Sequence, residues 1–224
     1  IDYPMASIRF HKFAIEGMQD IQKQTEKSKA FYFPYVEEKR GVADKLLIEL
    51  AKNAAAVVTD DYPTYFVPQM TAEAKGSIQT TYELVDSNGL LPIRIAEKEY
   101  VRAHDFRRFM HKNIEDFLVE VPEKSPLEYL NLKFDEKILE PIFKKYELVN
   151  FNKVNTQDFL NNLNVDKSVE VSDVVGGYNA AKSRLDLFAK KGFNDYSKLR
   201  SHPSEDASSQ LSPYFHFGHI STYE

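Results

Sequence analysis

The sequence predicts an α/β fold with a doubly wound parallel sheet, followed by a linker and the first helices of an all-helical part. In the first 120 residues, segments with helical periodicity alternate with short apolar runs, the order found in parallel sheets with right-handed crossovers. Near residue 121 the composition changes, because prolines and asparagines become frequent and only short helical pieces remain. We therefore expect an α/β domain over residues 1–120, a linker over 121–167 and the start of a helical domain over 168–224.

Four segments of the first part have helical periodicity. Apolar residues recur every three or four positions from Phe10 to Ile21, which predicts an amphipathic helix. Residues 41–55 form a second predicted helix, a weaker one covers about 65–75, and a long one covers 97–119.

Three short apolar runs predict the strands of the sheet. Residues 30–36 are aromatic and bounded by charges, and Pro34 marks the point where pairing should end. Residues 56–59 form the continuous apolar run of a buried parallel strand. Residues 81–85 form the third run, which the turn signal at 86–89 stops.

Two groups of polar residues in this part are better explained by local structure than by function. Asp60 and Asp61 follow a predicted strand, at the sheet edge where open α/β folds bind ligands. No glycine-rich phosphate loop accompanies them, so we expect them to accept local hydrogen bonds and expect no dinucleotide here. His104 and His111 lie two helical turns apart, too far to share a metal ion, so no metal site is predicted.

The composition is that of a globular protein. With 224 residues, of which 42% are hydrophobic and 13% aromatic, the chain can bury a core. It has no cysteine, which excludes disulfides and thiolate chemistry. No segment approaches the ~20 apolar residues of a membrane span, and no signal-peptide pattern is present. We expect a soluble, cytoplasmic protein without membrane contacts.

Charge is distributed unevenly along the chain. The net charge of −5 argues against indiscriminate nucleic-acid binding. Between residues 182 and 202, however, six basic and two acidic side chains give a local charge of +4. The basic residues are Lys182, Arg184, Lys190, Lys191, Lys198 and Arg200. Both a solvated helix face and a DNA contact surface fit this cluster.

The last fifty residues contain the strongest local signals. A helix is predicted from Gly176-Gly177 to a stop at Gly192, and Ser212-Pro213 has the form of a helix N-cap and first turn. Gly218 should end that short helix, and S-x-x-E at 221–224 has the form of a capping box that begins another.

The residues ahead of the short helix suit an anion. Ser208, Ser209 and Gln210 place hydroxyls, an amide and free backbone N–H groups where a phosphate or pyrophosphate could bind. Serines before Ser-Pro also serve as plain caps, so the residues alone leave both interpretations open.

The run SSQLSPYFHFGHIS at 208–221 resembles the flavin-binding signature of the DNA photolyase/cryptochrome family. Its ending HFGHIS resembles the class II cyclobutane pyrimidine dimer photolyases, although Ser208 stands where many relatives have threonine. Tyr196, Arg200 and Pro203 fit the family's Tyr-x-x-x-Arg-x-x-Pro pattern. Weaker likeness covers residues 1–7, 31–37, 57–63 and the pair Arg107-Arg108.

The resemblance implies a fold, cofactors and partners. It implies a Rossmann-like antenna domain and an all-α FAD-binding domain, with an antenna chromophore that is a folate or a deazaflavin. FAD phosphates and ribityl would contact Tyr196, Ser208, Ser209, Leu211 and Ser212. Arg200 would contact DNA, and the partner would be damaged DNA bound by a monomeric full-length protein. No residue of this chain is expected to act as a catalytic acid, base or nucleophile, since the flavin carries the chemistry.

The resemblance also implies that the chain is a fragment. The first residue is Ile1, and the family's opening strands have no counterpart, so we expect the first two strands of the sheet and the later helical half to be missing. Alone, the chain should neither bind FAD stoichiometrically nor repair DNA. Two alternatives stay open: a cryptochrome-like photoreceptor without repair, and an α/β module that binds a nucleotide or chromophore.

Overall fold

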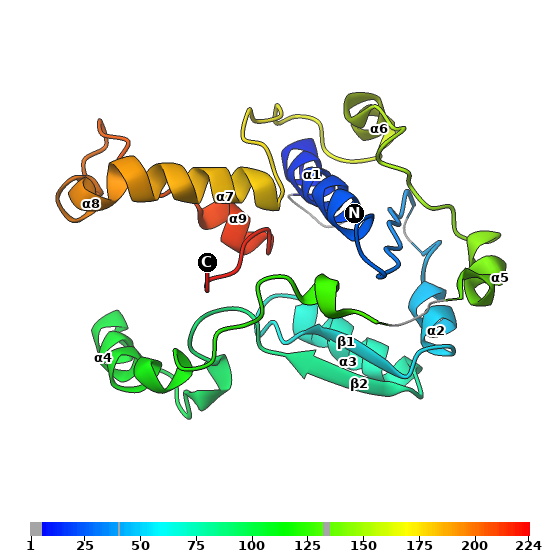
Figure 1. Ribbon diagram of the computed structural model, residues 1–224, viewed down its shortest axis with the longest axis horizontal. Coiled ribbons are helices and arrows are strands. Elements are labelled where there is room, and N and C mark those ends of the chain that lie inside the picture. Colours follow the sequence, from blue (N-terminus) through cyan, green and yellow to red (C-terminus); the bar gives the residue numbers. More distant parts are fainter. Residues whose placement is uncertain (1–5, 40, 132–134) are drawn as a thin grey trace.

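The computed structural model describes residues 6–39, 41–131 and 135–224. It is a mixed structure in which many short helices accompany a small parallel sheet (Figure 1). The α-helices are α1 Ile8–Thr25, α2 Leu46–Ala51, α3 Val67–Ser77, α4 Ala103–Asn113, α5 Glu140–Phe143, α6 Thr156–Asn162, α7 Tyr178–Leu187, α8 Phe193–Leu199 and α9 Ser212–His216. The strands are β1 Ala56–Asp60 and β2 Thr81–Val85, and the 3-10 turns are η1 Ile93–Ile95, η2 Ile114–Phe117, η3 Pro126–Tyr129 and η4 Glu136–Leu139. A π-helical turn, η5 Phe188–Gly192, joins α7 to α8.

The sheet confirms two of the three predicted strands and their parallel direction. β1 and β2 pair in parallel, with Ala56 opposite Thr81 and Asp60 opposite Val85, and α3 forms the connection between them. The prediction of a buried strand is wrong: β1 alternates between exposed and half-buried side chains, and Val58 is 59% exposed. A two-stranded sheet without a covering layer cannot bury both faces of a strand.

The predicted strand at residues 30–36 is wrong, because this segment is extended without a strand partner. Its aromatic side chains Phe31, Phe33 and Tyr35 pack against the core cluster around α5 instead. The carbonyl of Pro34 accepts a hydrogen bond from the Val149 amide at 2.9 Å. Alternating aromatic residues can therefore pack against a helix as well as form a strand of a sheet.

Helix positions were predicted better than helix lengths. The amphipathic helix predicted from Phe10 is confirmed as α1. The helix predicted at 41–55 is reduced to α2, because a turn occupies residues 41–45 and Gly41 has a φ of 87°. The helix predicted at 97–119 is α4 followed by η2. Arg107 and Arg108 lie exposed on α4, as do His104 and His111.

Three predicted features of the C-terminal part differ in the structure. Gly192 does not end a helix, because the chain continues through η5 into α8. Helix α9 begins at Ser212, as predicted, but Leu211 holds the cap position and no side chain caps the helix. Residues after Ser221 form a turn in which the Ser221 hydroxyl accepts from the Tyr223 amide at 3.1 Å. Of the family-like segment 1–7, residues 1–5 lie outside the described residues.

Helix α1 lies between α6 and α7 (Figure 1). It contributes side chains to two hydrophobic cores. One contains Ile8, Ile15, Phe151, Leu160 and Leu163. The other contains Phe13, Ala181, Leu211, Tyr214 and Ile220. A third core, around Leu139, Ile142 and Tyr146, joins α5 to the extended segment at 30–36. The second core positions the predicted flavin-binding loop.

Candidate functional site

The predicted phosphate-binding residues form a loop that is fixed to α7 from behind. Arg184 donates from Nε to the Ser209 carbonyl at 2.9 Å and from Nη2 to the Ser208 carbonyl at 3.1 Å. Leu211 is buried in the core that α1, α7 and α9 share. A buried anchor at one end and a guanidinium against the carbonyls therefore fix the backbone of this loop.

The hydroxyls of the loop remain available for a ligand. Ser208 and Ser212 are exposed and Ser209 is half-buried. The Ser209 hydroxyl accepts a long hydrogen bond from the Leu211 amide at 3.4 Å. Because Leu211 points into the core, only its backbone could contact a cofactor. Helix α9 has five residues, so loop hydroxyls and amides are the principal candidate ligands rather than a helix dipole.

The turn after the loop has the geometry predicted for Gly218. This glycine has a φ of 66°, in the left-handed region that lacks a penalty only for glycine. The His219 amide donates to the Tyr214 carbonyl at 2.8 Å, and the Gly218 amide donates to the Phe215 carbonyl at 3.3 Å. These two bonds form a Schellman motif, which confirms Gly218 as the end of α9.

Tyr196 lies on α8, and Arg200 directly follows the end of this helix. The guanidinium of Arg200 lies 5.7 Å from the centre of the Tyr196 ring, and that ring contacts Phe188 edge-to-face at 5.6 Å. Both side chains are exposed at the surface. Of the other basic residues in the cluster, Lys190, Lys191 and Lys198 are exposed.

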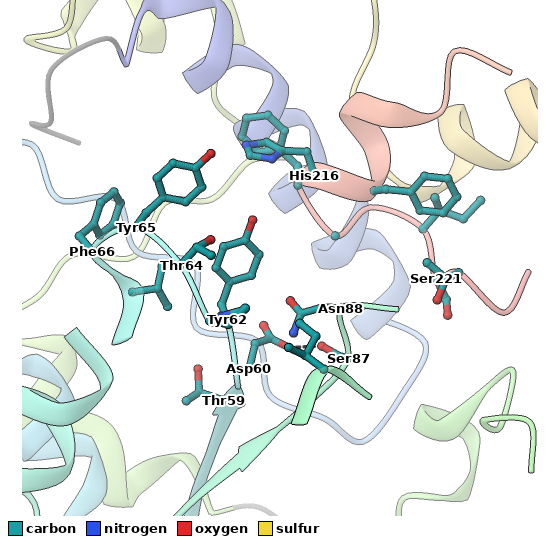
Figure 2. Close-up of a pocket in the computed structure, with 18 residues that line it drawn as sticks. Thr59, Asp60, Tyr62, Thr64, Tyr65, Phe66, Ser87, Asn88, His216 and Ser221 are labelled. Atoms are coloured by element: carbon teal, nitrogen blue, oxygen red, sulfur yellow. Dashed lines mark hydrogen bonds between the residues drawn. The ribbon is translucent and has the colours of Figure 1, made fainter. Parts of the chain in front are cut away.

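A pocket of about 1150 Å³ separates the end of β1 from the segment around α9 (Figure 2). Tyr62 and Tyr65 come from the segment after β1, Ser87 and Asn88 follow β2, and His216 belongs to α9. Residues on both sides are therefore aromatic or polar, and the second half of the family-like run contributes to the lining. Ser208, Ser209, Leu211 and Ser212 do not line this pocket.

The two aspartates at the end of β1 accept hydrogen bonds from residues far along the chain, whereas the sequence predicted donors at the next loop or helix start. Asp60 accepts from the Ser87 hydroxyl, and Asp61 accepts two hydrogen bonds from the Arg94 guanidinium. These hydrogen bonds from Arg94 lower the pKa of Asp61 below its ordinary value. The donors are side chains rather than the backbone amides that were expected.

The loop rests on a buried junction between α1 and α7. The Gly177 amide donates to His219 Nδ1 at 2.9 Å, and the imidazole stacks on Phe13 at 4.7 Å. Two α1 carboxylates accept from backbone amides at the start of α7: Gly176, just ahead of the helix, donates to Glu16 at 2.7 Å, and Asn179 donates to Asp20 at 2.9 Å. Burial lowers the pKa of His219, while the nearby Asp20 and Glu16 oppose that shift.

Sequence reasoning missed the most informative residues of both sites. In the sequence, Arg184 is only one charge of the basic cluster, and its spacing from Ser209 gives no local signal. Tyr62 and Tyr65 lie in an irregular segment, and Tyr65 has a φ of 60°. The aromatic content of residues 62–66 directly after a strand was the signal that could have identified the pocket.

Two further classes of site are not found in the part of the chain that is described. Residues 6–39, 41–131 and 135–224 contain no cluster of three His, Asp or Glu side chains that could hold a metal ion. Among the same residues, no helix combines the length and apolar character needed to cross a bilayer.

Comparisons with known proteins identify the class of enzyme that the chain resembles. No family model matches the chain. Two curated proteins are similar to the chain in sequence, and both are photo-lyases. Each is named deoxyribodipyrimidine photo-lyase. The protein of Methanothermobacter thermautotrophicus is 27% identical over 221 residues, covering 98% of this chain and 45% of the relative. That of Potorous tridactylus is 26% identical over 230 residues, covering 96% of this chain and 38% of the relative.

The resemblance to photolyases stated from the motif is thereby confirmed over nearly the whole chain. The chain spans less than half the length of either relative.

Proposed function

We propose that this chain is part of a class II deoxyribodipyrimidine photo-lyase, a flavoprotein that splits cyclobutane pyrimidine dimers in damaged DNA by electron transfer from reduced FAD. The observation that carries the proposal is the run at 208–221, which lies in a chain similar to photo-lyases along 96–98% of its length. The parts are an antenna domain at 1–120 with a doubly wound sheet, a linker at 121–167 and the start of the FAD-binding helical domain at 168–224. A monomeric, cytoplasmic protein remains our prediction.

The loop at 208–212 suits the anionic part of FAD. Its hydroxyls are exposed, and its carbonyls at Ser208 and Ser209 are turned toward Arg184, which leaves the amide side of the loop for phosphate oxygens. Ser208, Ser209 and Ser212 would donate from hydroxyls, and Leu211 would contribute its backbone. Tyr196 would contact the phosphates from α8. The bound flavin would supply the electron that opens the cyclobutane ring, and the chain would bind and orient it.

Arg200 and the exposed lysines of α8 and η5 form the proposed contact to DNA. Lys190, Lys191, Lys198 and Arg200 are exposed on one continuous stretch of chain. Contacts of this kind go to phosphates and carry no sequence information, which suits an enzyme that recognises a lesion rather than a sequence. The affinity should fall steeply as salt concentration rises.

The pocket at the end of β1 favours a second candidate, an antenna-chromophore site in the same protein. Its volume of about 1150 Å³ exceeds what a drug-sized ligand requires, and Tyr62, Tyr65 and Phe66 offer aromatic surfaces. Asn88 and Ser87 add polar groups at the carboxyl end of parallel strands, where open α/β sheets bind ligands. The chromophore would be a folate or a deazaflavin.

The proposal is tested on the product of the complete reading frame that contains this chain. We expect about one FAD per chain and light-dependent repair of an oligonucleotide with one cyclobutane dimer. Ser209→Ala and Ser212→Ala together should lower the flavin content several-fold, whereas Ser183→Ala, whose hydroxyl is satisfied by the Asn179 carbonyl at 2.8 Å, should retain it. Flavin without repair would indicate a cryptochrome-like photoreceptor. Unchanged flavin in the double variant would remove the two serines from the site.

The same measurement on the 224-residue chain alone has a different expected result. We expect no stoichiometric flavin and no repair, because the relatives have more than half of their length beyond the matched region. Flavin absorbance near one per chain in the purified 224-residue protein would contradict this.

A further inference from the structure

We propose that Arg184 is a positioning residue for anion binding by the loop at 208–212. Its guanidinium holds two consecutive carbonyls, and this orients the amides of Ser209 and Gln210 to donate to a phosphate on the opposite side. The inference rests on the proposed function, since the loop is taken to bind the flavin phosphates.

The orientation follows from peptide geometry. Arg184 binds the Ser209 carbonyl at 2.9 Å and the Ser208 carbonyl at 3.1 Å. In a trans peptide the C=O and the following N–H point in opposite directions. The amides of Ser209 and Gln210 therefore point away from Arg184. Within the described residues, neither amide makes a hydrogen bond to another protein group.

The backbone that follows has a shape suited to an anion. Gln210 has a φ of 54°, in the left-handed region, and Leu211 has φ −86° and ψ −9°, in the right-handed region. Successive residues of opposite hand turn neighbouring N–H groups toward one concave side, an arrangement that binds anions. The side-chain amide of Gln210 donates to the Asp206 carboxylate at 2.5 Å, so the Gln210 side chain already has a partner.

Arginine is suited to this task in a way that lysine is not. A planar guanidinium presents parallel donors to two acceptors, whereas an ammonium is a point charge on a flexible stem. The Arg184 side chain is only 20% exposed, and its helix is anchored by Ala181, which is fully buried in the same core as Leu211. The donors are therefore held in place before a ligand binds. Asp206 lies 3.6 Å from the guanidinium and partly balances its charge.

The experiment measures anion binding to the 15N-labelled 224-residue chain, with inorganic pyrophosphate and ADP as probes. In the wild-type chain, the amide resonances of Ser209 and Gln210 should shift on titration, with a Kd on the order of 1 mM. Arg184→Gln and Arg184→Lys should both weaken binding by about tenfold. Lys182→Gln removes a charge from the same helix without touching the loop, and it should stay within about twofold of wild type.

The lysine variant separates geometry from charge. If Arg184 acted only through its charge, Arg184→Lys would bind like wild type, and this result would overturn the proposal. If Arg184 only stabilised the fold, both variants would melt at lower temperature but the folded protein would bind pyrophosphate with wild-type affinity, which would also overturn it. If Arg184→Gln does not fold, the pyrophosphate affinity of Arg184→Lys alone decides between these outcomes.

Failure of the inference differs from failure of the proposed function. If pyrophosphate shifts the Ser209 and Gln210 amides in the wild-type chain and the Arg184 variants bind it with the same affinity, only the positioning role is removed. Absence of any shift at these amides in the wild-type chain, up to about 20 mM pyrophosphate, would remove the phosphate site and the positioning role together.

Discussion

His219 is a titratable side chain whose protonation would break a backbone hydrogen bond. Its Nδ1 accepts from the Gly177 amide at 2.9 Å, so this nitrogen must carry no proton. Burial lowers the pKa of His219 from 6.5, and the carboxylates of Glu16 and Asp20 oppose that shift. A Cβ at position 17 would lie 2.3 Å from His219 Nε2, so only a glycine in α1 leaves room for the ring. The neutral imidazole is therefore the form that the folded chain requires.

We predict that the chain loses stability as pH falls below 6.5, and that His219 causes part of the loss. A pKa that is lower in the folded state means that the unfolded state binds the proton first, so stability is full above the unfolded pKa and is lost as pH falls toward the folded one. His219→Asn keeps an acceptor for Gly177 and should flatten denaturant-derived stability between pH 7 and pH 5. The exposed His202→Asn should keep the wild-type slope. An unchanged slope in His219→Asn would contradict the assignment.

A second prediction concerns Asp20, which caps a helix other than its own. Its carboxylate accepts from the Asn179 amide at 2.9 Å and from the Asn179 side chain, so α1 provides the cap that the sequence of α7 lacks. Asp20→Ala should lower the free energy of unfolding by about 1–2 kcal/mol. Asp173→Ala removes an exposed carboxylate on the connection to α7 and should change it by less than about 0.5 kcal/mol. Equal effects of the two substitutions would show that Asp20 acts only as a charge.

At single positions, the sequence predicts which residue types suit a ligand. It does not predict how their backbone and side chains are oriented. Ser208 and Ser209 were identified from the run itself. Their carbonyl partner Arg184 lies more than twenty positions away, and only the packing of α7 against the loop brings it there. Ser-Pro favours a cap at Ser212, but Ser212 is the first helical residue, and the buried Leu211 holds the cap position.

At the scale of elements, two helical glycines give a matched prediction. A Cβ at Gly17 in α1 would lie 2.3 Å from His219 Nε2, whereas a Cβ at Gly76 in α3 would meet nothing within 4 Å. Gly76→Ala should stabilise the chain by about 0.5–1 kcal/mol through helix propensity. Gly17→Ala should destabilise it by about 1–3 kcal/mol, because the ring must move from its stacked position on Phe13. Denaturant unfolding of both variants tests this, and stabilisation by Gly17→Ala would show that α1 and the His219 ring do not approach so closely.

Elements with a local cause were predictable, and those with a tertiary cause were not. β1 and β2 have apolar runs bounded by turn signals, and α1 has a full apolar stripe, so all three were found. The run at 30–36 has the same alternation as a strand, but its partner is α5, about a hundred residues away. Gly192 has the local signals of a helix end, but it lies in the π-helical turn η5, and Phe188 of this turn packs edge-to-face on Phe193 of α8.

At the scale of the whole molecule, stability is concentrated around α1. This helix contributes Ile8 and Ile15 to one core and Phe13 to another, so the connection at 149–163 and the family-like run at 208–221 pack on the same element. The β1–β2 pair has no buried residue in either strand, and α3 has none either. The proposed phosphate loop at 208–212 therefore packs on the well-buried part of the molecule around α1. The pocket at the end of β1 lies between this part and the sheet, which has no buried side chains.

Hydrogen exchange of the 224-residue chain should show this division. Amides of α1 should be protected about a hundredfold more than those of β1 and β2, because a two-stranded sheet without buried side chains can open without disturbing a core. Ile15→Ala, at a side chain 3% exposed, should lower protection in α1 and leave the strands unchanged. Val58→Ala, at a side chain 59% exposed, should leave α1 unchanged. Equal protection of strands and α1 would mean that the sheet is covered in solution, and such a cover would also close one side of the pocket.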